Sequence, residues 1–375
     1  MGQLEVIPLT GTLSEQALKY PVYNFANRGV HLDKHNVYYA KDGVLYKQDR
    51  VRPQLLDQLD LSDYGIEGIR INKYHAYDKT IIFLVNYANG RKYIFKFDTA
   101  SPNEVEFVEK HGPSGRILTA GDSLIIISGA VKTNYGSLIN KYDLNEISAR
   151  GMLGAQKIDS LRSLSPPFAI AVYDENLQLV DSLDTINRTQ GRGAAFFDLW
   201  LDMPMDISEE DEIYIADMDA GYNIEKYSIK GELLATHDIS SGSFKAIQAQ
   251  LDLSQIKKYK SMSGVFSRIY ALYEKGDYLI TSYFDNPANR EPAHPPYYFD
   301  IISKDGQHQL SGASAYPIIA EDTEEKIFLL VKQEGGWFSS DKIYLVGLTL
   351  ENFFEGQYEK EIVDRAIMKY EKRGG

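Results

Sequence analysis

Residues 205–235, MDISEEDEIYIADMDAGYNIEKYSIKGELLA, hold four short strand patterns separated by polar turns. The segments 205–207, 213–216, 223–227 and 232–235 are rich in the β-branched, aromatic and apolar residues that favour strands. Asp, Asn, Ser and Gly stand between them and are typical of hairpin turns. The stretch therefore predicts one four-stranded antiparallel sheet, the unit of a propeller blade.

The most apolar segment of this stretch recurs along the chain. Six runs share its character: 37–40, 81–85, 124–127, 213–216, 278–281 and 327–331. They start 44, 43, 89, 65 and 49 residues apart, which fits blade repeats of about 40 to 50 residues with insertions. Because the runs are apolar throughout, we expect them to be inner strands that are covered on both faces. The sequence predicts an all-β fold, a six-bladed β-propeller.

The interval of 89 residues leaves a second blade count open. It contains an aromatic residue before a polar turn at both Tyr142 and Tyr173, but one clear inner strand, at 124–127. Either residues 137–165 are an insertion in one blade, or residues 150–190 form a seventh blade. Six blades is the favoured reading and seven is the alternative.

Two further segments belong to the propeller domain, which we expect to span residues 1–350. A strand pattern at 4–9 precedes the first blade and would complete the last one, at 313–350, which removes a free sheet edge. A helical insertion is expected at about 243–262, where apolar residues have roughly helical spacing: Phe244, Ile247, Leu251 and Tyr259.

Residues 351–375 differ from the rest of the chain in their periodicity. Apolar residues follow i, i+4 spacing with charged residues between them: Phe354, Tyr358, Ile362, Ala366 and Tyr370. This pattern predicts a C-terminal amphipathic helix of about five turns that packs on the propeller.

The segments 206–217 and 223–232 resemble an NHL-type repeat, which pairs an I-Y-V-A-D strand with an I-x-x-F-x-x-x-G strand. Over about residues 28–350 the chain resembles the bacterial six-bladed β-propellers grouped as NHL-repeat-like or TolB-like. The resemblance implies an exported protein, often a lipoprotein, in the periplasm or at the cell surface, whose signal and lipid anchor this chain lacks. A cytoplasmic location is the alternative. No reaction is implied, because propellers carry many functions.

Composition and charge exclude several classes of protein. The chain has 40 basic and 53 acidic residues and a net charge of −13, which argues against binding to nucleic acid. It has no cysteine, so disulfides, thiol nucleophiles and cysteine-based metal sites are excluded. No apolar stretch reaches the roughly 20 residues of a transmembrane helix. The oligomeric state is left open.

The proline-rich segment 285–297 is the most distinctive local feature. Its prolines prevent it from pairing as a strand, so it is either a stiff connection between strands or a recognition loop. Its amides, cations and aromatic rings suit a saccharide or a peptide, and the candidate ligand-binding residues here are Asn286, Asn289, Arg290, His294 and Tyr297. Trp337, in a polar hairpin, is a further candidate, as are Tyr74 and His75 before the run 81–85.

Catalytic motifs are missing from the sequence. Gly112-Pro113-Ser114-Gly115 lacks the spacing of a nucleophile elbow. The segment 217–221 alternates oxygen-bearing side chains but has no Glu at the twelfth loop position, so we expect a turn cap and not a calcium site. We predict a non-enzymatic binding scaffold of the bacterial cell envelope that recognises a protein, peptide or saccharide through loops on one face. The alternative is a calcium-supported hydrolase or lyase with its site at the central channel.

Overall fold

The structure of the chain is a computed structural model. It describes residues 4–10, 30–41, 44–52, 54–60, 70–77, 80–86, 92–98, 105–110, 117–120, 124–128, 170–174, 176–183, 204–208, 210–217, 222–245, 266–286, 296–322, 326–333 and 342–373.

The described strands form six four-stranded antiparallel sheets. Sheet 1 contains β2 (Val30–Leu32), β3 (Asn36–Lys41), β4 (Val44–Asp49) and β5 (Leu55–Asp60). Sheet 2 contains β6 (Arg70–Tyr77), β7 (Thr80–Asn86), β8 (Lys92–Asp98) and β9 (Val105–Lys110). Sheet 3 contains β10 (Ile117–Ala120), β11 (Leu124–Ser128), β12 (Ile170–Tyr173) and β13 (Leu179–Leu183).

The other three sheets come from the second half of the chain and from the N-terminus. Sheet 4 contains β14 (Met205–Ile207), β15 (Glu212–Asp217), β16 (Asn223–Ser228) and β17 (Leu233–Asp238). Sheet 5 contains β18 (Phe266–Lys275), β19 (Tyr278–Asn286), β20 (Tyr297–Ser303) and β21 (His308–Ser314). Sheet 6 contains β22 (Ile318–Glu321), β23 (Ile327–Gln333), β24 (Lys342–Leu348) and β1 (Glu5–Pro8).

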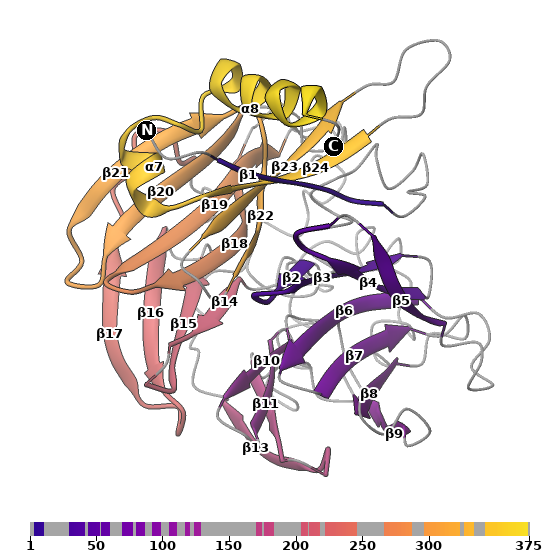
Figure 1. Ribbon diagram of the computed structural model, residues 1–375. Helices are drawn as coiled ribbons and strands as arrows, with labels where there is room; N and C mark the ends of the chain where they lie inside the picture. Colours follow the sequence, from indigo (N-terminus) through magenta and orange to yellow (C-terminus); the bar gives the residue numbers. More distant parts are fainter. Residues whose placement is uncertain are drawn as a thin grey trace, which may run out of the picture.

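Contacts between neighbouring sheets arrange them in a propeller-like ring (Figure 1). Every one of these contacts involves the first strand of at least one of the two sheets: β3 with β6, β6 with β10, β10 with β14, β14 with β18, β18 with β22, and β22 with β2. The last contact closes the ring and includes a parallel bridge between Leu32 and Asp322. The all-β class and the propeller-like architecture that the sequence predicts are confirmed.

The six apolar runs of the sequence lie in the second strand of each sheet, β3, β7, β11, β15, β19 and β23. The inner strand of a sheet is the one nearest the centre of the ring, and here it is the first strand, because the first strands contact the neighbouring sheets. The prediction that the apolar runs are the inner strands was therefore wrong, since the runs lie one strand further out. Each second strand is flanked by a strand on both sides, and an apolar run at this position fits a strand that is covered on both faces. In β15 the four residues from Ile213 to Ala216 are accordingly all buried.

The long interval in the repeat falls within sheet 3. β11 pairs with β12, and Ile125 lies opposite Tyr173, so the strand that ends at Tyr173 belongs to the same sheet as the run at 124–127. This is the arrangement that the insertion alternative requires. Residues 129–169, which include the expected insertion at 137–165, lie outside the described residues.

The N-terminal strand β1 pairs antiparallel with β24, with Glu5 opposite Gly347 and Pro8 opposite Tyr344. It is the fourth strand of sheet 6, the position that the sequence predicts for it. A strand from the start of the chain thus completes the sheet built by its end.

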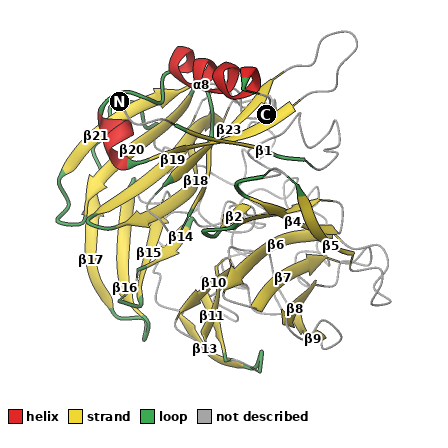
Figure 2. Cartoon of the chain, in the orientation of Figure 1, coloured by secondary structure: helices red, strands yellow, loops and turns green. Residues whose placement is uncertain are grey.

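The C-terminal segment contains two helices, α7 (Leu350–Phe354) and α8 (Lys360–Lys372), which lie together beside sheets 5 and 6 (Figure 2). The prediction of one helix of about five turns was wrong, because the chain turns between them at Gly356, whose φ is +75°. The buried residues are Phe353, Val363 and Ile367, whereas Phe354 is 44% exposed.

Two other expectations, a helical insertion and the lack of a transmembrane helix, can be compared with the structure only within the described residues. Of the helical insertion at 243–262, residues 243–245 are described and are not helical, and 246–265 lie outside. Neither α7 nor α8, the helices of the described part of the chain, has the length and apolar character that crossing a membrane requires.

Candidate functional site

The two ends of the sheets carry different connections. Because neighbouring strands are antiparallel, the connections from first to second and from third to fourth strand lie at one end of a sheet. We call this end the turn face. The connections from second to third strand, and from fourth strand to the next sheet, belong to the opposite end, the loop face.

Two of the predicted ligand-binding residues, Asn286 and Tyr297, lie at the loop face of sheet 5. Asn286 ends β19 and Tyr297 begins β20 in sheet 5, and β23 and β24 of sheet 6 end and begin at the same face. Between these strand ends lie four predicted residues that are outside the described part: Asn289, Arg290, His294 and Trp337. Their role in binding stays a prediction.

Tyr74 and His75 are separated from this group. They lie in β6, opposite Phe83 and Ile82, near the end of the strand that leads to the turn face. The backbone topology therefore does not bring them together with the residues of sheets 5 and 6. Their role in ligand binding stays a prediction.

Two adjacent tyrosines at the start of β20 have different environments. Tyr297 is 4% exposed and contacts the ring of Tyr270 edge-on, and burial raises its pKa to about 12. Tyr298 is partly exposed and stacks on Tyr283 at 5.4 Å between ring centroids. Successive side chains of a strand point to opposite faces, so Tyr297 contributes to the core and Tyr298 offers the accessible ring. The apolar residues at alternate positions, Tyr297, Phe299 and Ile301, could have indicated that Tyr298 lies on the other face of β20.

Tyr283, beneath Tyr298, is held by an aromatic cluster between sheets 4 and 5. Its ring meets those of Phe244 and Tyr222 edge-on, with centroid distances of 5.3 and 5.8 Å. Phe244 and Tyr222 stack at 4.2 Å. The Tyr283 hydroxyl forms a hydrogen bond of 2.9 Å with that of Ser241. The support under Tyr298 is therefore fixed from two sheets.

A polar group borders this aromatic surface. Lys245 Nζ lies 2.5 Å from Asp285 Oδ2, and this hydrogen bond raises the pKa of Lys245, with a smaller contribution from Tyr298. The Ser267 hydroxyl donates to Asp285 Oδ1 at 3.1 Å and accepts from the Lys245 backbone N–H at 2.9 Å. We call Lys245, Ser267, Asp285 and Tyr298 the loop-face cluster.

The chemistry of the loop-face cluster favours recognition over catalysis. It offers an aromatic face, a lysine side chain that is 51% exposed and a carboxylate that already has two donors. A general base would need a carboxylate or imidazole free to accept a proton. An aromatic face bordered by donors and acceptors is typical of ligand-binding surfaces.

A buried carboxylate lies deeper between sheets 4 and 5. Asp300 is fully buried and accepts hydrogen bonds from the Tyr222 hydroxyl at 2.8 Å and from the Ser311 hydroxyl. Tyr222 also shares a hydrogen bond with Thr281. Burial, and next the charge of Asp300, raises the pKa of Tyr222 well above its ordinary value. This network was not predicted from the sequence, although a lone Asp in the apolar strand β20 is typical of a buried, hydrogen-bonded group.

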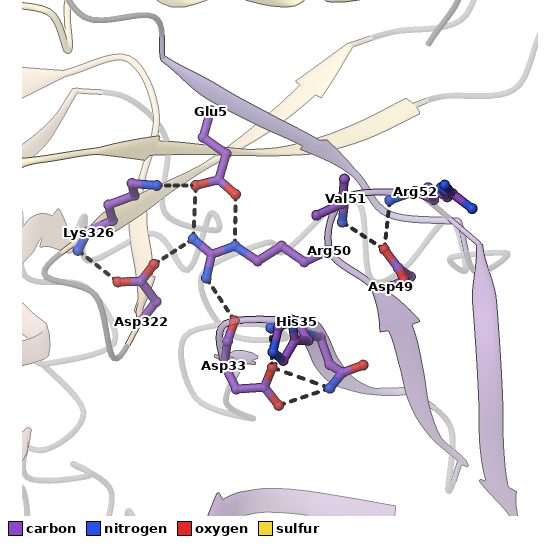
Figure 3. A network of polar contacts seen from close by, with 10 residues as sticks. Glu5, Asp33, His35, Asp49, Arg50, Val51, Arg52, Asp322 and Lys326 are labelled. Carbon is purple, nitrogen blue, oxygen red and sulfur yellow. Dashed lines mark hydrogen bonds and ion pairs between the residues drawn. The ribbon is translucent and has the colours of Figure 1, made fainter.

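A second polar network lies where the ring closes (Figure 3). Arg50, which is 6% exposed, binds Glu5 and Asp322, and Lys326 Nζ lies 2.7 Å from Glu5 Oε2. Nearby, Asp33 Oδ1 accepts from the backbone N–H groups of His35 and Asn36, both at 2.6 Å. These interactions join strands and shape turns, and they leave the main charges of the network paired.

A metal site is not evident in the part of the chain that the structure describes. Within it, no three His, Asp or Glu side chains are close enough to hold a metal ion. The segment 218–221, where the sequence has its superficial calcium-loop pattern, lies outside that part.

Comparison with known proteins gives structural similarity alone. The sequence matches no protein-family model and no curated protein. A protein of unknown function from Bacteroides caccae is 11% identical over 76% of this chain and 80% of its own, with a TM-score of 0.42. The Pan2 WD40 domain of Neurospora crassa is 10% identical over 92% and 96%, with a TM-score of 0.45. PorZ, a bacterial surface component of the type-IX secretion system of Porphyromonas gingivalis, is 10% identical over 87% and 36%, with a TM-score of 0.36. Values this low say nothing about function.

Proposed function

We propose that the chain is a six-bladed β-propeller of the NHL-repeat-like or TolB-like kind. Each of the six four-stranded sheets is one blade, and the contact of β2 with β22 closes the ring. The NHL-type sequence pattern coincides with the first three strands of sheet 4, β14, β15 and β16, which supports the assignment of a sheet to a repeat.

The function that the geometry supports best is a non-enzymatic binding scaffold of the bacterial cell envelope, in the periplasm or at the cell surface. It recognises a protein, peptide or saccharide at the loop face. The observation that supports this proposal is the partly exposed ring of Tyr298, which stacks on the buried Tyr283 beside the ion pair of Lys245 and Asp285. A fixed aromatic ring loses little entropy when a ligand covers it, because its support is already in place.

The test is a binding screen on glycan and peptide arrays, followed by titration of the best ligand. Tyr298→Ala should weaken binding about tenfold or more, since it removes the stacking surface. Tyr46→Ala is the matched control, because Tyr46 stacks on the buried Tyr39 at 5.2 Å in sheet 1, far from the cluster in sequence. Equal affinity of wild type and Tyr298→Ala for every ligand found would refute the site.

Three further candidate residues, predicted from the sequence, extend this test. Asn286→Ala, Arg290→Ala and Trp337→Ala each alter a side chain that the sequence assigns to ligand binding. In the proposal they contact a ligand centred on Tyr298, so each should weaken the same ligand that Tyr298→Ala weakens.

The alternative function, a calcium-supported hydrolase or lyase at the central channel, gives a different result in a thermal-shift experiment. Calcium would then raise the melting temperature by several degrees, and a chelator would reverse the rise. The scaffold proposal expects no calcium-dependent change.

A further inference from the structure

Helix α8 uses one side to pack on the propeller. Val363 and Ile367 are fully buried. Ile362, Ala366 and Tyr370 are partly buried against the same core cluster of sheets 5 and 6. The apolar side of the helix is therefore already occupied by its own protein.

Two acidic residues of α8 are also turned toward the protein. Asp364 accepts a hydrogen bond from the Tyr316 hydroxyl and pairs with Lys360 at 2.5 Å. Glu371 pairs with Lys342 at 2.6 Å and accepts from the Tyr344 hydroxyl at 2.8 Å. These contacts remove two negative charges from the outer side of the helix.

The outer side that remains is basic. The exposed residues on it are Arg365, Met368, Lys369, Lys372 and Arg373, spaced by three or four residues along one face of the helix and its cap. We call them the basic face. Among the described residues, none of its four cations makes an ion pair, and Glu361 is the one exposed acid within α8.

The helix dipole explains part of this pattern. Lys369 and Lys372 lie in the last turn, where cations interact favourably with the carbonyl end of the dipole. That effect is confined to the last turn, so it does not account for Arg365 one turn earlier. It also gives no reason for Met368 to be 50% exposed in the middle of the cations.

We propose that the basic face of α8 binds an acidic segment of a partner protein. The chain carries a net charge of −13, so four unpaired cations on one helix face are opposite in sign to the chain as a whole. Arg365 can bind a carboxylate with two parallel hydrogen bonds, and Met368 offers an adaptable apolar contact at the centre. This inference is independent of the loop-face cluster.

A lipid surface and a nucleic acid fit the basic face less well. A helix that binds a membrane buries its apolar side among the lipids, and the apolar side of α8 is covered by sheets 5 and 6. A nucleic acid would have to overcome repulsion by the net charge of −13. A short segment that carries carboxylates can bind through attraction to the four cations of the basic face alone.

The test uses the full chain and a fluorescein-labelled Glu-rich peptide that contains one Leu, with fluorescence anisotropy as the readout. Wild type should bind the peptide at about 50 mM salt and lose most of the binding at about 500 mM, where charges are strongly screened. The double variant Arg365→Glu with Lys369→Glu should weaken binding about tenfold or more. Exchange of the two residues, Arg365→Lys with Lys369→Arg, should retain binding.

The matched control reverses two exposed cations elsewhere, Arg52→Glu with Lys230→Glu, and should leave the affinity unchanged. Melting temperatures verify folding, and Arg365→Gln provides a second variant if the double reversal does not fold. The proposal fails if wild type does not bind the peptide at low salt, or if the control pair weakens binding equally. It also fails if phosphatidylserine vesicles, single-stranded DNA or a second copy of the chain bind through Arg365 and Lys369 while the peptide does not.

Discussion

Arg50 and Glu5 join the first and last sheets of the ring through a two-point ion pair. Arg50 Nε and a terminal guanidinium nitrogen lie 2.7 and 2.9 Å from the two oxygens of Glu5. The same guanidinium group donates to Asp322 at 2.6 Å and to the Asp33 carbonyl at 2.7 Å. Arg50 follows β4 of sheet 1, whereas Glu5 and Asp322 belong to sheet 6, so one side chain spans the point where the ring closes (Figure 3).

Replacement of Arg50 should destabilise the folded ring strongly. Arg50→Met removes the charge but keeps an apolar stem, and it leaves the fully buried Asp322 side chain without its guanidinium partner. We expect the free energy of unfolding to fall by about 3 kcal/mol in urea denaturation. Arg52→Met, at an exposed neighbouring cation, should change it by less than about 0.5 kcal/mol. Equal effects of the two variants would contradict a closing role for Arg50.

The same contact predicts how stability depends on pH. Burial alone would raise the pKa of Glu5, but hydrogen bonds and charge attraction from Arg50 and Lys326 outweigh it and hold the pKa below its ordinary value of 4.5. The ionised carboxylate therefore stabilises the fold above pH 4.5, and this contribution is lost as the pH falls through the lower folded pKa.

Thermal melting between about pH 3 and pH 7 tests this dependence. The melting temperature of wild type should fall in the acid range, and Glu5→Gln should be less stable at neutral pH and respond less to acid. Lys34, exposed on the β2–β3 turn, provides a control through Lys34→Gln, which should follow the wild-type curve. Parallel curves for wild type and Glu5→Gln would show that other carboxylates cause the acid response.

The repeat architecture could be predicted because every second strand contains an unbroken apolar run, and in β15, β19 and β23 the residues of that run are almost all buried. The identity of the inner strands could not, since β14 and β22 are short and include polar residues such as Asp206 and Glu321. Asp206, the middle residue of β14, pairs with a neighbouring sheet, since it accepts a hydrogen bond from the backbone N–H of Glu274 in β18 at 2.7 Å. The sequence alone does not show which distant residue will pair with such a polar side chain.

The candidate site was predictable only in part for a similar reason. The proline-rich segment directed attention to the loop-face end of sheet 5, where β19 ends and β20 begins. The choice of Tyr297 over Tyr298 then depended on which face of β20 meets the core. Lys245 and Phe244 come from a different connection and approach Asp285 and Tyr283 only after folding.

Two adjacent phenylalanines at the end of α7 should respond differently to truncation. Phe353 is fully buried and contacts the ring of Phe299 edge-on at 5.2 Å, whereas Phe354 is 44% exposed. Phe353→Ala should lower the free energy of unfolding by about 3 to 4 kcal/mol, and Phe354→Ala by less than about 1 kcal/mol. Chemical denaturation of the two variants measures the difference. The reverse order would revive the sequence prediction, in which Phe354 begins the buried stripe.

The ring of Phe299 in β20 also covers Gly312, which lies opposite it in β21. Phe299 lies opposite Gly312 of β21, and a Cβ at Gly312 would collide with its ring. The ring cannot move freely, because it contacts Phe353 at 5.2 Å and Tyr358 at 4.8 Å and is 1% exposed. Gly312→Ala should therefore cost about 1 to 3 kcal/mol of unfolding free energy.

Two further variants test whether the collision is the cause. Gly242→Ala, at a glycine with no atom within 4 Å of the added Cβ, should be neutral or slightly stabilising. In a Phe299→Leu background, which shortens the side chain over Gly312, Gly312→Ala should cost less than in wild type, as expected for residues in contact. An equal cost in both backgrounds would mean that Gly312 is required for its backbone freedom. A reduced cost would show that the collision of the added Cβ with the Phe299 ring causes the loss of stability.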